Sequence, residues 1–167
     1  MIEFMVLGLP RSGTTWAANW LTTDTTICYH DPLYRWHYTE LDIIQTNKVV
    51  GISCTGLYHF ADWVNDHPSR KVILHRDLSD INASMASIGL PCLSEKDEEK
   101  LYSIDGIHID WLDVFERPKS TYEFLTGKPF DAERHSELIN IEMQPQFAGL
   151  TVNRNVTKRL IDEIRSI

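Results

Sequence analysis

The 167-residue chain is poor in the features that mark several specialised classes of protein. It has three cysteines, an odd number that is widely spaced, which argues against a disulfide framework or a zinc site and favours a reducing compartment. No apolar run is long enough to cross a bilayer. The first residues also lack the charged and apolar segments of a secretion signal. We therefore expect a cytoplasmic protein without a membrane partner.

Positive charge is scarce as well. The chain has 16 lysines and arginines against 24 acidic residues, which gives a net charge of −8. This balance provides no basic footprint for nucleic acid, so we expect no such partner. Internal repeats and low-complexity segments are absent, and the 43% of hydrophobic residues is typical of a globular protein. The length fits a single domain over 1–167 that buries a real core.

What is present is an alternation of short apolar runs with helix-like stretches. In such a pattern right-handed crossovers produce a mostly parallel sheet of about five strands flanked by helices. Ligands of such sheets bind at the carboxyl ends of the strands, so each loop that follows a strand is a candidate part of a site. The predicted strands are Glu3–Leu7, Thr26–Tyr29, Lys48–Ser53, Lys71–His75 and Ile107–Trp111, and the first predicted helices are Thr14–Leu21, Tyr34–Gln45, Leu57–Asn65 and Leu78–Ile88.

The strongest motif is the glycine loop between the first strand and the first helix, Gly8-Leu9-Pro10-Arg11-Ser12-Gly13-Thr14-Thr15. Its glycines permit a tight turn, and its backbone N–H groups favour an anion. The spacing from Gly8 to Gly13 matches the P-loop pattern, but Thr14 occupies the lysine position. Arg11 supplies a positive charge from inside the loop instead. We interpret the loop as a phosphate cradle and the α/β fold as a P-loop three-layer fold.

A second motif follows the fourth predicted strand, where the apolar run ends in Arg76. The helix after it carries Asp80 and Ser84, which are four residues apart and share one face. The planar guanidinium of an arginine pairs bidentately with phosphate oxygens, which makes Arg76 a candidate anion ligand. The alternative is a structural ion pair between Arg76 and a nearby carboxylate such as Asp80.

The run from Pro10 to Trp16 resembles the 5′-phosphosulfate loop of the P-loop sulfotransferases, which use 3′-phosphoadenosine 5′-phosphosulfate (PAPS). The Arg76–Ser84 segment is similar to the 3′-phosphate motif of the same family. The resemblance covers Ile2–Ser84 closely and Ile107–Asp131 loosely. It implies PAPS as the donor, 3′-phosphoadenosine 5′-phosphate (PAP) as the product, and no metal. It also implies a stacking contact between Trp16 and adenine, for which the alternative is a place in the core. The donor-binding residues that it implies are Arg11, Ser12, Gly13, Thr14, Thr15, Trp16, Arg76 and Ser84.

The resemblance also implies catalytic residues. Many relatives carry a Glu-Pro after the second strand, whose carboxylate takes the proton of the acceptor, and Asp31 matches that position. Two alternatives stay open, namely that Asp31 caps the next helix and that His30 is the base. His59, beyond the third strand, corresponds loosely to a histidine of hormone-type members, with simple packing as its alternative. Arg11 would stabilise charge on the bridging oxygen of the donor.

The sequence therefore predicts transfer of a sulfuryl group to an unidentified hydroxyl or amine acceptor. Ser53 and Cys54 stand where many relatives have a strand-end lysine. This departure keeps open a non-catalytic nucleotide-binding protein of the same fold. A small P-loop kinase is a further alternative, which Thr14 in the lysine position disfavours. A second copy of the chain could complete the acceptor site as a homodimer.

Overall fold

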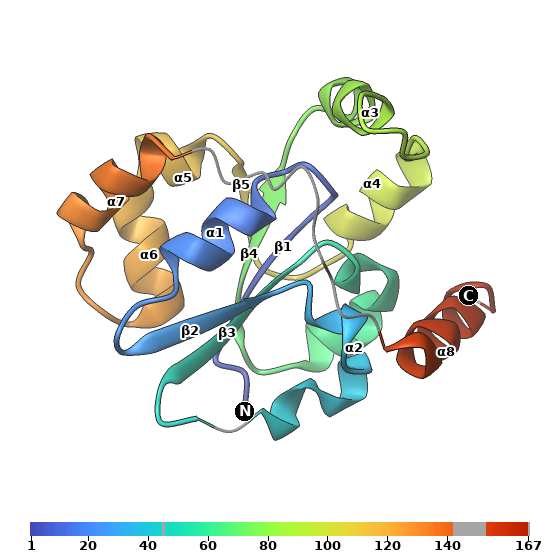
Figure 1. Ribbon diagram of the computed structural model, residues 1–167, viewed down its shortest axis with the longest axis horizontal. Coiled ribbons are helices and arrows are strands. Elements are labelled where there is room, and N and C mark those ends of the chain that lie inside the picture. The colour runs from blue at the N-terminus through green and yellow to red at the C-terminus, as the bar shows by residue number, and fades with distance from the viewer. Residues whose placement is uncertain (45, 142–152, 167) are drawn as a thin grey trace.

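In the computed structural model, residues 1–44, 46–141 and 153–166 are described. They contain a five-stranded sheet in which every pair of neighbouring strands is parallel, in the order β2-β3-β1-β4-β5 (Figure 1). The predicted fold class, an α/β fold with a central sheet between layers of helices, is confirmed. The strands are β1 (Phe4–Gly8), β2 (Thr26–His30), β3 (Val49–Cys54), β4 (Arg70–His75) and β5 (Ile107–Asp110).

The connections leave β1 and its neighbour β4 in opposite directions. The chain passes from β1 to β2 through a helix on one face of the sheet. It passes from β4 to β5 through helices on the other face. The loops that follow β1 and β4 therefore run toward opposite faces of the sheet at the carboxyl ends of these strands. Ligands of open parallel sheets bind at such switch points. The two predicted anion motifs are the segments that follow β1 and β4.

Helices cover both faces of the sheet (Figure 1). One face packs against α1 (Thr14–Trp20), α5 (Asp113–Glu116), α6 (Pro118–Thr126) and α7 (Ala132–Ile139). The other face packs against η3 (Leu57–Phe60), α2 (Ala61–Asp66), α3 (Leu78–Ala86), α4 (Glu95–Tyr102) and α8 (Arg154–Ile164).

Strand β1 shows how the sequence builds the two layers. All its residues are buried, as expected for a central parallel strand. Side chains alternate between the faces of a strand, so Phe4 and Val6 join the core beneath α1 while Met5 and Leu7 join the core beneath α2. This rigid central strand ends at Gly8, where the candidate loop begins.

The predicted helix over Tyr34–Gln45 is wrong. The chain forms two short 3-10 helices instead, η1 (Pro32–Tyr34) and η2 (Tyr38–Ile43), and residue 45 lies outside the described residues. Aromatic and β-branched residues crowd this stretch and lower its helix propensity. His37 between the two turns adopts an extended backbone, and its ring bonds the Thr39 hydroxyl at 2.9 Å and Glu163 of α8 at 3.0 Å.

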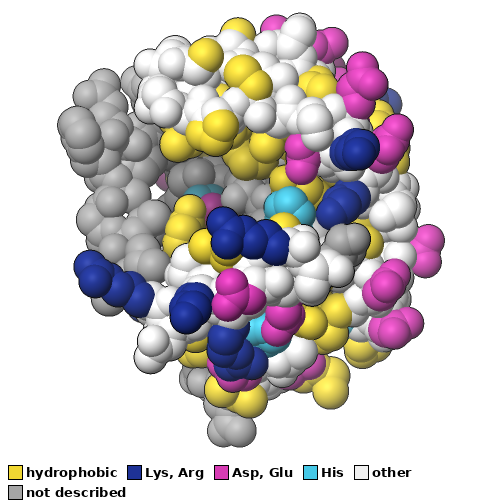
Figure 2. Space-filling model, turned by 90° about the vertical axis from the view of Figure 1, so that its right-hand side faces the viewer, with side chains coloured by type: hydrophobic (Ala, Val, Ile, Leu, Met, Phe, Trp, Pro, Cys, Tyr) yellow, Lys and Arg dark blue, Asp and Glu magenta, His cyan; other side chains and the backbone are white. Residues whose placement is uncertain are grey.

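None of the described helices combines the length and the apolar character that a membrane crossing requires. The side of the molecule that carries α8 is hollowed, and basic and histidine side chains lie along the hollow (Figure 2).

Candidate functional site at the carboxyl edge of the sheet

The loop between β1 and α1 depends on its two glycines. A Cβ atom at Gly8 would lie 3.2 Å from the Leu74 carbonyl oxygen and 3.3 Å from the Ser12 Cβ, so the close approach of the loop to β4 needs glycine there. Gly13 has a φ of 82°, a left-handed conformation that glycine adopts without strain, and it leads directly into α1. The glycine spacing of the motif thus has a local structural reason at both ends.

The structure brings together three residues that the sequence assigned to anion binding. The Arg11 side chain reaches α3, where its Nε donates to the Ser84 Oγ at 2.8 Å. Arg76, which directly follows β4, donates from Nη1 to the Arg11 carbonyl oxygen at 2.8 Å. The two predicted motifs therefore form one connected group at the carboxyl ends of β1 and β4.

Two buried polar atoms in this group have no hydrogen-bond partner among the described residues. They are the Ser12 Oγ and the Arg76 Nε. A buried donor or acceptor without a partner costs about 1–3 kcal/mol, so such atoms need an explanation, and a bound ligand or water is the usual one. The alternative in which Arg76 forms an ion pair with Asp80 is not seen in the described structure.

Trp111 was not singled out in the sequence. It directly follows β5, and its ring centroid lies 4.9 Å from the Arg76 guanidinium carbon, which is cation–π geometry. Its ring also faces the space beside Gly13, where a Cβ would lie 3.7 Å away. Its position at a strand end was the signal that could have identified it.

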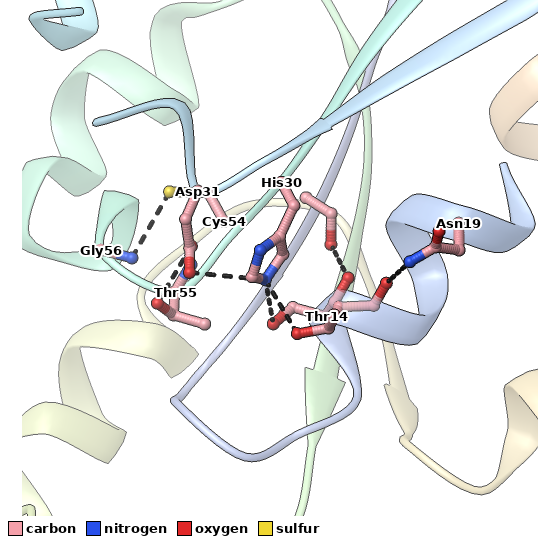
Figure 3. A network of polar contacts seen from close by, with 9 residues as sticks. Thr14, Asn19, His30, Asp31, Cys54, Thr55 and Gly56 are labelled. Atoms are coloured by element: carbon pink, nitrogen blue, oxygen red, sulfur yellow. Dashed lines mark hydrogen bonds and ion pairs between the residues drawn. The ribbon is translucent and has the colours of Figure 1, made fainter. Parts of the chain in front are cut away.

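A second polar group lies where β2 ends (Figure 3). The Asp31 Oδ1 accepts from the Thr55 backbone N–H at 2.7 Å and from the Thr55 hydroxyl at 3.0 Å, while Oδ2 lies 3.4 Å from the His30 Nε2. His30 Nε2 also lies 3.1 Å from the Thr15 hydroxyl and 3.5 Å from that of Thr14. This network joins the ends of β2 and β3 to the first turn of α1. The capping alternative for Asp31 is wrong, because its side chain makes no capping bond to η1.

Residues at the end of β3 form a hydrogen bond to the start of α1 and supply no positive charge. The Ser53 Oγ donates to the Thr14 carbonyl oxygen at 2.8 Å in a buried position. Burial raises the pKa of the Cys54 thiol well above its usual range, which keeps the thiol neutral. Thr55, which follows them, holds Asp31 and was also missed in the sequence, although it too stands at a strand end.

Positive charge at this edge comes from Arg11 and Arg76. His75 ends β4, and burial together with nearby His108 lowers its pKa to about 4, against the opposing effect of Asp110. Its Nε2 lies 2.7 Å from the His108 Nδ1. At neutral pH His75 is therefore uncharged.

Two predicted site residues lie outside this polar network. His59 on η3 packs on Tyr58 with ring centroids 4.0 Å apart. Burial and the Lys100 charge of α4 lower the pKa of His59, against Asp97. Trp16 is only 7% exposed, donates from Nε1 to the Leu138 carbonyl oxygen at 3.2 Å, and packs on Phe115. The structure thus places Trp16 in the core, with little of its ring open to a base.

Backbone strain marks the same edge. Within the described ranges, Arg11 (φ 71°) and Asp31 (φ 42°) are the non-glycine residues with positive φ. A left-handed conformation costs a non-glycine residue on the order of 1–3 kcal/mol, and such residues cluster at functional sites. Both residues belong to the predicted catalytic set; Asp31 directly follows β2, and Arg11 lies in the loop between β1 and α1.

The described residues contain no group of three histidine, cysteine or acidic side chains arranged to hold a metal ion. Comparison with protein-family models and with curated proteins finds no match. The function must therefore be argued from the geometry of this site.

Proposed function

We propose that this protein transfers a sulfuryl group from PAPS to a hydroxyl or amine acceptor. The observation that supports this proposal is the meeting of two anion motifs at one edge of the sheet, through the Arg11–Ser84 and Arg76–Arg11 hydrogen bonds of 2.8 Å each. PAPS carries anionic groups at both its 5′ and its 3′ positions, so a donor of this kind needs two such motifs side by side.

The glycine loop would hold the 5′ end of the donor. Its backbone N–H groups and the hydroxyls of Thr14 and Thr15 bind the phosphate, in the manner of a P-loop. The Arg11 guanidinium, anchored through Nε on Ser84, supplies the cation that the missing lysine supplies in triphosphate enzymes. It stabilises charge that builds on the bridging oxygen as the S–O bond breaks. Donors prepared for developing charge usually make the largest contribution to catalysis.

The second motif would hold the 3′-phosphate. Arg76 keeps one contact with the loop through Nη1, while its buried Nε has no partner among the described residues. Phosphate oxygens are strong acceptors for an arginine, and a charge-assisted bond of this kind is worth about 1.5–3 kcal/mol. Ser84 belongs to the same motif, and its hydroxyl, which accepts from Arg11, would donate to this phosphate as the second ligand.

Two rival functions share this site. The lack of a cation at the end of β3, where Ser53 and Cys54 stand, favours a non-catalytic nucleotide-binding protein. A small kinase would use magnesium and ATP, and Thr14 in place of the lysine disfavours it.

A transfer assay separates the three functions. The protein is incubated with sulfur-labelled PAPS and a panel of phenols, alcohols and amines, and PAP is measured beside the sulfated product. We expect acceptor-dependent formation of PAP in equal amount to the sulfated product. Tight binding of PAP without transfer to any acceptor would favour the non-catalytic function, and magnesium-dependent ATP turnover would favour the kinase.

A further inference from the structure

We propose that His30, rather than Asp31, takes the proton of the acceptor, and that Asp31 and Thr55 position His30 for this step. The inference rests on the proposed function and names the base of the same site. It is carried by the network in Figure 3, which joins these residues to the first turn of α1.

The contacts of Asp31 suit its carboxylate to position His30 rather than to take a proton itself. Its Oδ1 already accepts two hydrogen bonds from Thr55, and its side chain is only 12% exposed. The left-handed backbone at Asp31 (φ 42°) fixes the direction of this side chain. Its second oxygen, Oδ2, lies 3.4 Å from the His30 Nε2. Little of the carboxylate is therefore left for an incoming acceptor.

The His30 side chain, in contrast, is more exposed than that of Asp31. It is 32% exposed, and each of its described polar contacts is made through Nε2. The negative charge of the Asp31 carboxylate beside Nε2 favours the tautomer in which Nε2 carries the proton. The Thr15 hydroxyl is compatible with this tautomer, because it can also accept. Nδ1 then carries the lone pair and has no hydrogen-bond partner among the described residues.

The acceptor oxygen attacks sulfur, and its proton passes to the His30 Nδ1. The new O–S bond forms while the S–O bond to the 5′-phosphate breaks, and the electron pair goes to that phosphate oxygen beside Arg11. The charge of the His30 imidazolium is stabilised by the Asp31 carboxylate, whose Oδ2 lies 3.4 Å from Nε2. An aspartate that orients a histidine and stabilises its charged form is the same division of roles as in hydrolase triads.

The tautomer of His30 gives the first test and needs no acceptor. Long-range ¹H–¹⁵N correlation spectra of histidine-labelled protein are recorded with and without PAP. We expect the Nε2–H form in the wild type and a mixture of the two forms in Asp31→Asn. A proton found on Nδ1 in the wild type would overturn the inference, because Nδ1 could then not be the base.

Chemical rescue gives the second test. A positioned general base contributes typically about 10²–10⁴-fold in rate, so His30→Ala should lose about this much transfer while PAP affinity stays within about twofold. Imidazole in the buffer should restore part of the rate of His30→Ala. It should not raise the rate of the wild type or of Asp42→Asn, which alters the carboxylate of a different His–Asp pair.

The outcomes distinguish this inference from the proposed function. Wild-type protein that does not bind PAP would refute both. Normal PAP binding together with wild-type transfer in His30→Ala would refute only the role of His30. Loss of PAP affinity in His30→Ala, without rescue by imidazole, would show that His30 merely supports the loop.

Discussion

The sheet carries a His–Asp pair at each of its two edges. His30 and Asp31 lie at the carboxyl end of β2, with their closest charged atoms 3.4 Å apart. His67 precedes β4 at the opposite edge, and its Nε2 lies 3.0 Å from the Asp42 Oδ2. The residue types are the same in both pairs, but their surroundings differ.

The amino-edge pair uses all its polar atoms within the fold. The His67 Nδ1 accepts from the Ser69 N–H at 3.2 Å, and the Asp42 Oδ1 accepts from the Ile2 N–H at 2.7 Å. The His67 side chain is only 5% exposed. This pair therefore ties the residues before β1 to those before β4, and it leaves no ring nitrogen for chemistry.

In the carboxyl-edge pair, by comparison, the described polar contacts of the histidine are all made through one ring nitrogen, Nε2. This histidine is 32% exposed, and the aspartate of the pair has a left-handed backbone. Buried atoms without a partner among the described residues occur at both edges, in Ser12 and Arg76 at one and in Ser69 at the other, so the contrast depends on exposure and on strain. Backbone strain of this kind clusters at functional sites. We therefore expect substitutions at the carboxyl edge to change function and substitutions at the amino edge to change stability.

The largest expected effect is on catalysis at the carboxyl edge. Arg11→Ala should lower the rate of sulfuryl transfer by about 10²–10³-fold, because it removes the charge that stabilises the leaving phosphate oxygen. Thermal unfolding should show that the fold is kept. Unchanged turnover in this variant would remove Arg11 from the mechanism.

A smaller effect is expected on the affinity for PAP, and two arginines at opposite ends of β4 test it. Arg76→Ala should weaken PAP binding by about ten- to a hundredfold, since a charge-assisted bond is worth about 1.5–3 kcal/mol. The matched control is Arg70→Ala at the amino end of β4, where Arg70 contacts Glu3 at 3.7 Å and the Phe124 carbonyl oxygen at 3.1 Å. Calorimetry should find PAP affinity unchanged in this control. Equal losses in both variants would contradict the difference between the edges.

The amino-edge pair should show its role in stability. Asp42→Asn should lower the free energy of unfolding by about 1 kcal/mol, a modest value because the Asp42 side chain is 42% exposed and screened by solvent. PAP binding should be unaffected.

The same substitution has a predicted pH dependence. Burial raises the pKa of Asp42, but the hydrogen bonds from Ile2 and His67 outweigh it and hold the pKa below the usual value. The stabilisation is therefore present above the pKa of the unfolded state and is lost as the pH falls through the folded pKa. Denaturant titrations at several pH values should show the difference between wild type and Asp42→Asn shrinking in acid. A difference that stays constant would contradict this role.

The smallest effect tests the strain in the loop. Arg11→Gly should be more stable than Arg11→Ala by about 0.5–1 kcal/mol, because relief of the left-handed conformation is partly offset by the entropy of unfolded glycine. Arg35, with a φ of −119°, is the matched control, and there alanine should be the more stable substitution. The reverse order at position 11 would mean that the loop stores no strain.

The sequence predicted the sheet well because its three central strands, β3, β1 and β4, are short runs that are almost entirely buried. All five runs form strands, and the loop and the Arg76 motif lie at the carboxyl edge as expected. The predicted helix over Tyr34–Gln45 was wrong because aromatic and β-branched residues lower the helix propensity of this stretch and because His37 contacts distant Glu163. Periodicity carries no information about such long-range contacts.

The site was only partly predictable for a related reason. Strand-end position identified Asp31 and Arg76, since parallel strands bring their carboxyl ends together, and the glycine loop motif identified Arg11. Neither signal could show that Asp31 turns toward His30 and Thr55, because this depends on the left-handed backbone at Asp31. The burial of Trp16 under α5 and α7 also depends on residues about a hundred positions away.

The central claim is that the carboxyl edge holds two anion pockets for one nucleotide. Calorimetric titration of the wild-type protein with PAP and with AMP tests it most directly, because the two ligands differ only in the 3′-phosphate. We predict that PAP binds at least about tenfold more tightly, the value of one charge-assisted contact. Equal affinities would mean that the pocket around Arg76 does not exist, and the proposed donor would be wrong.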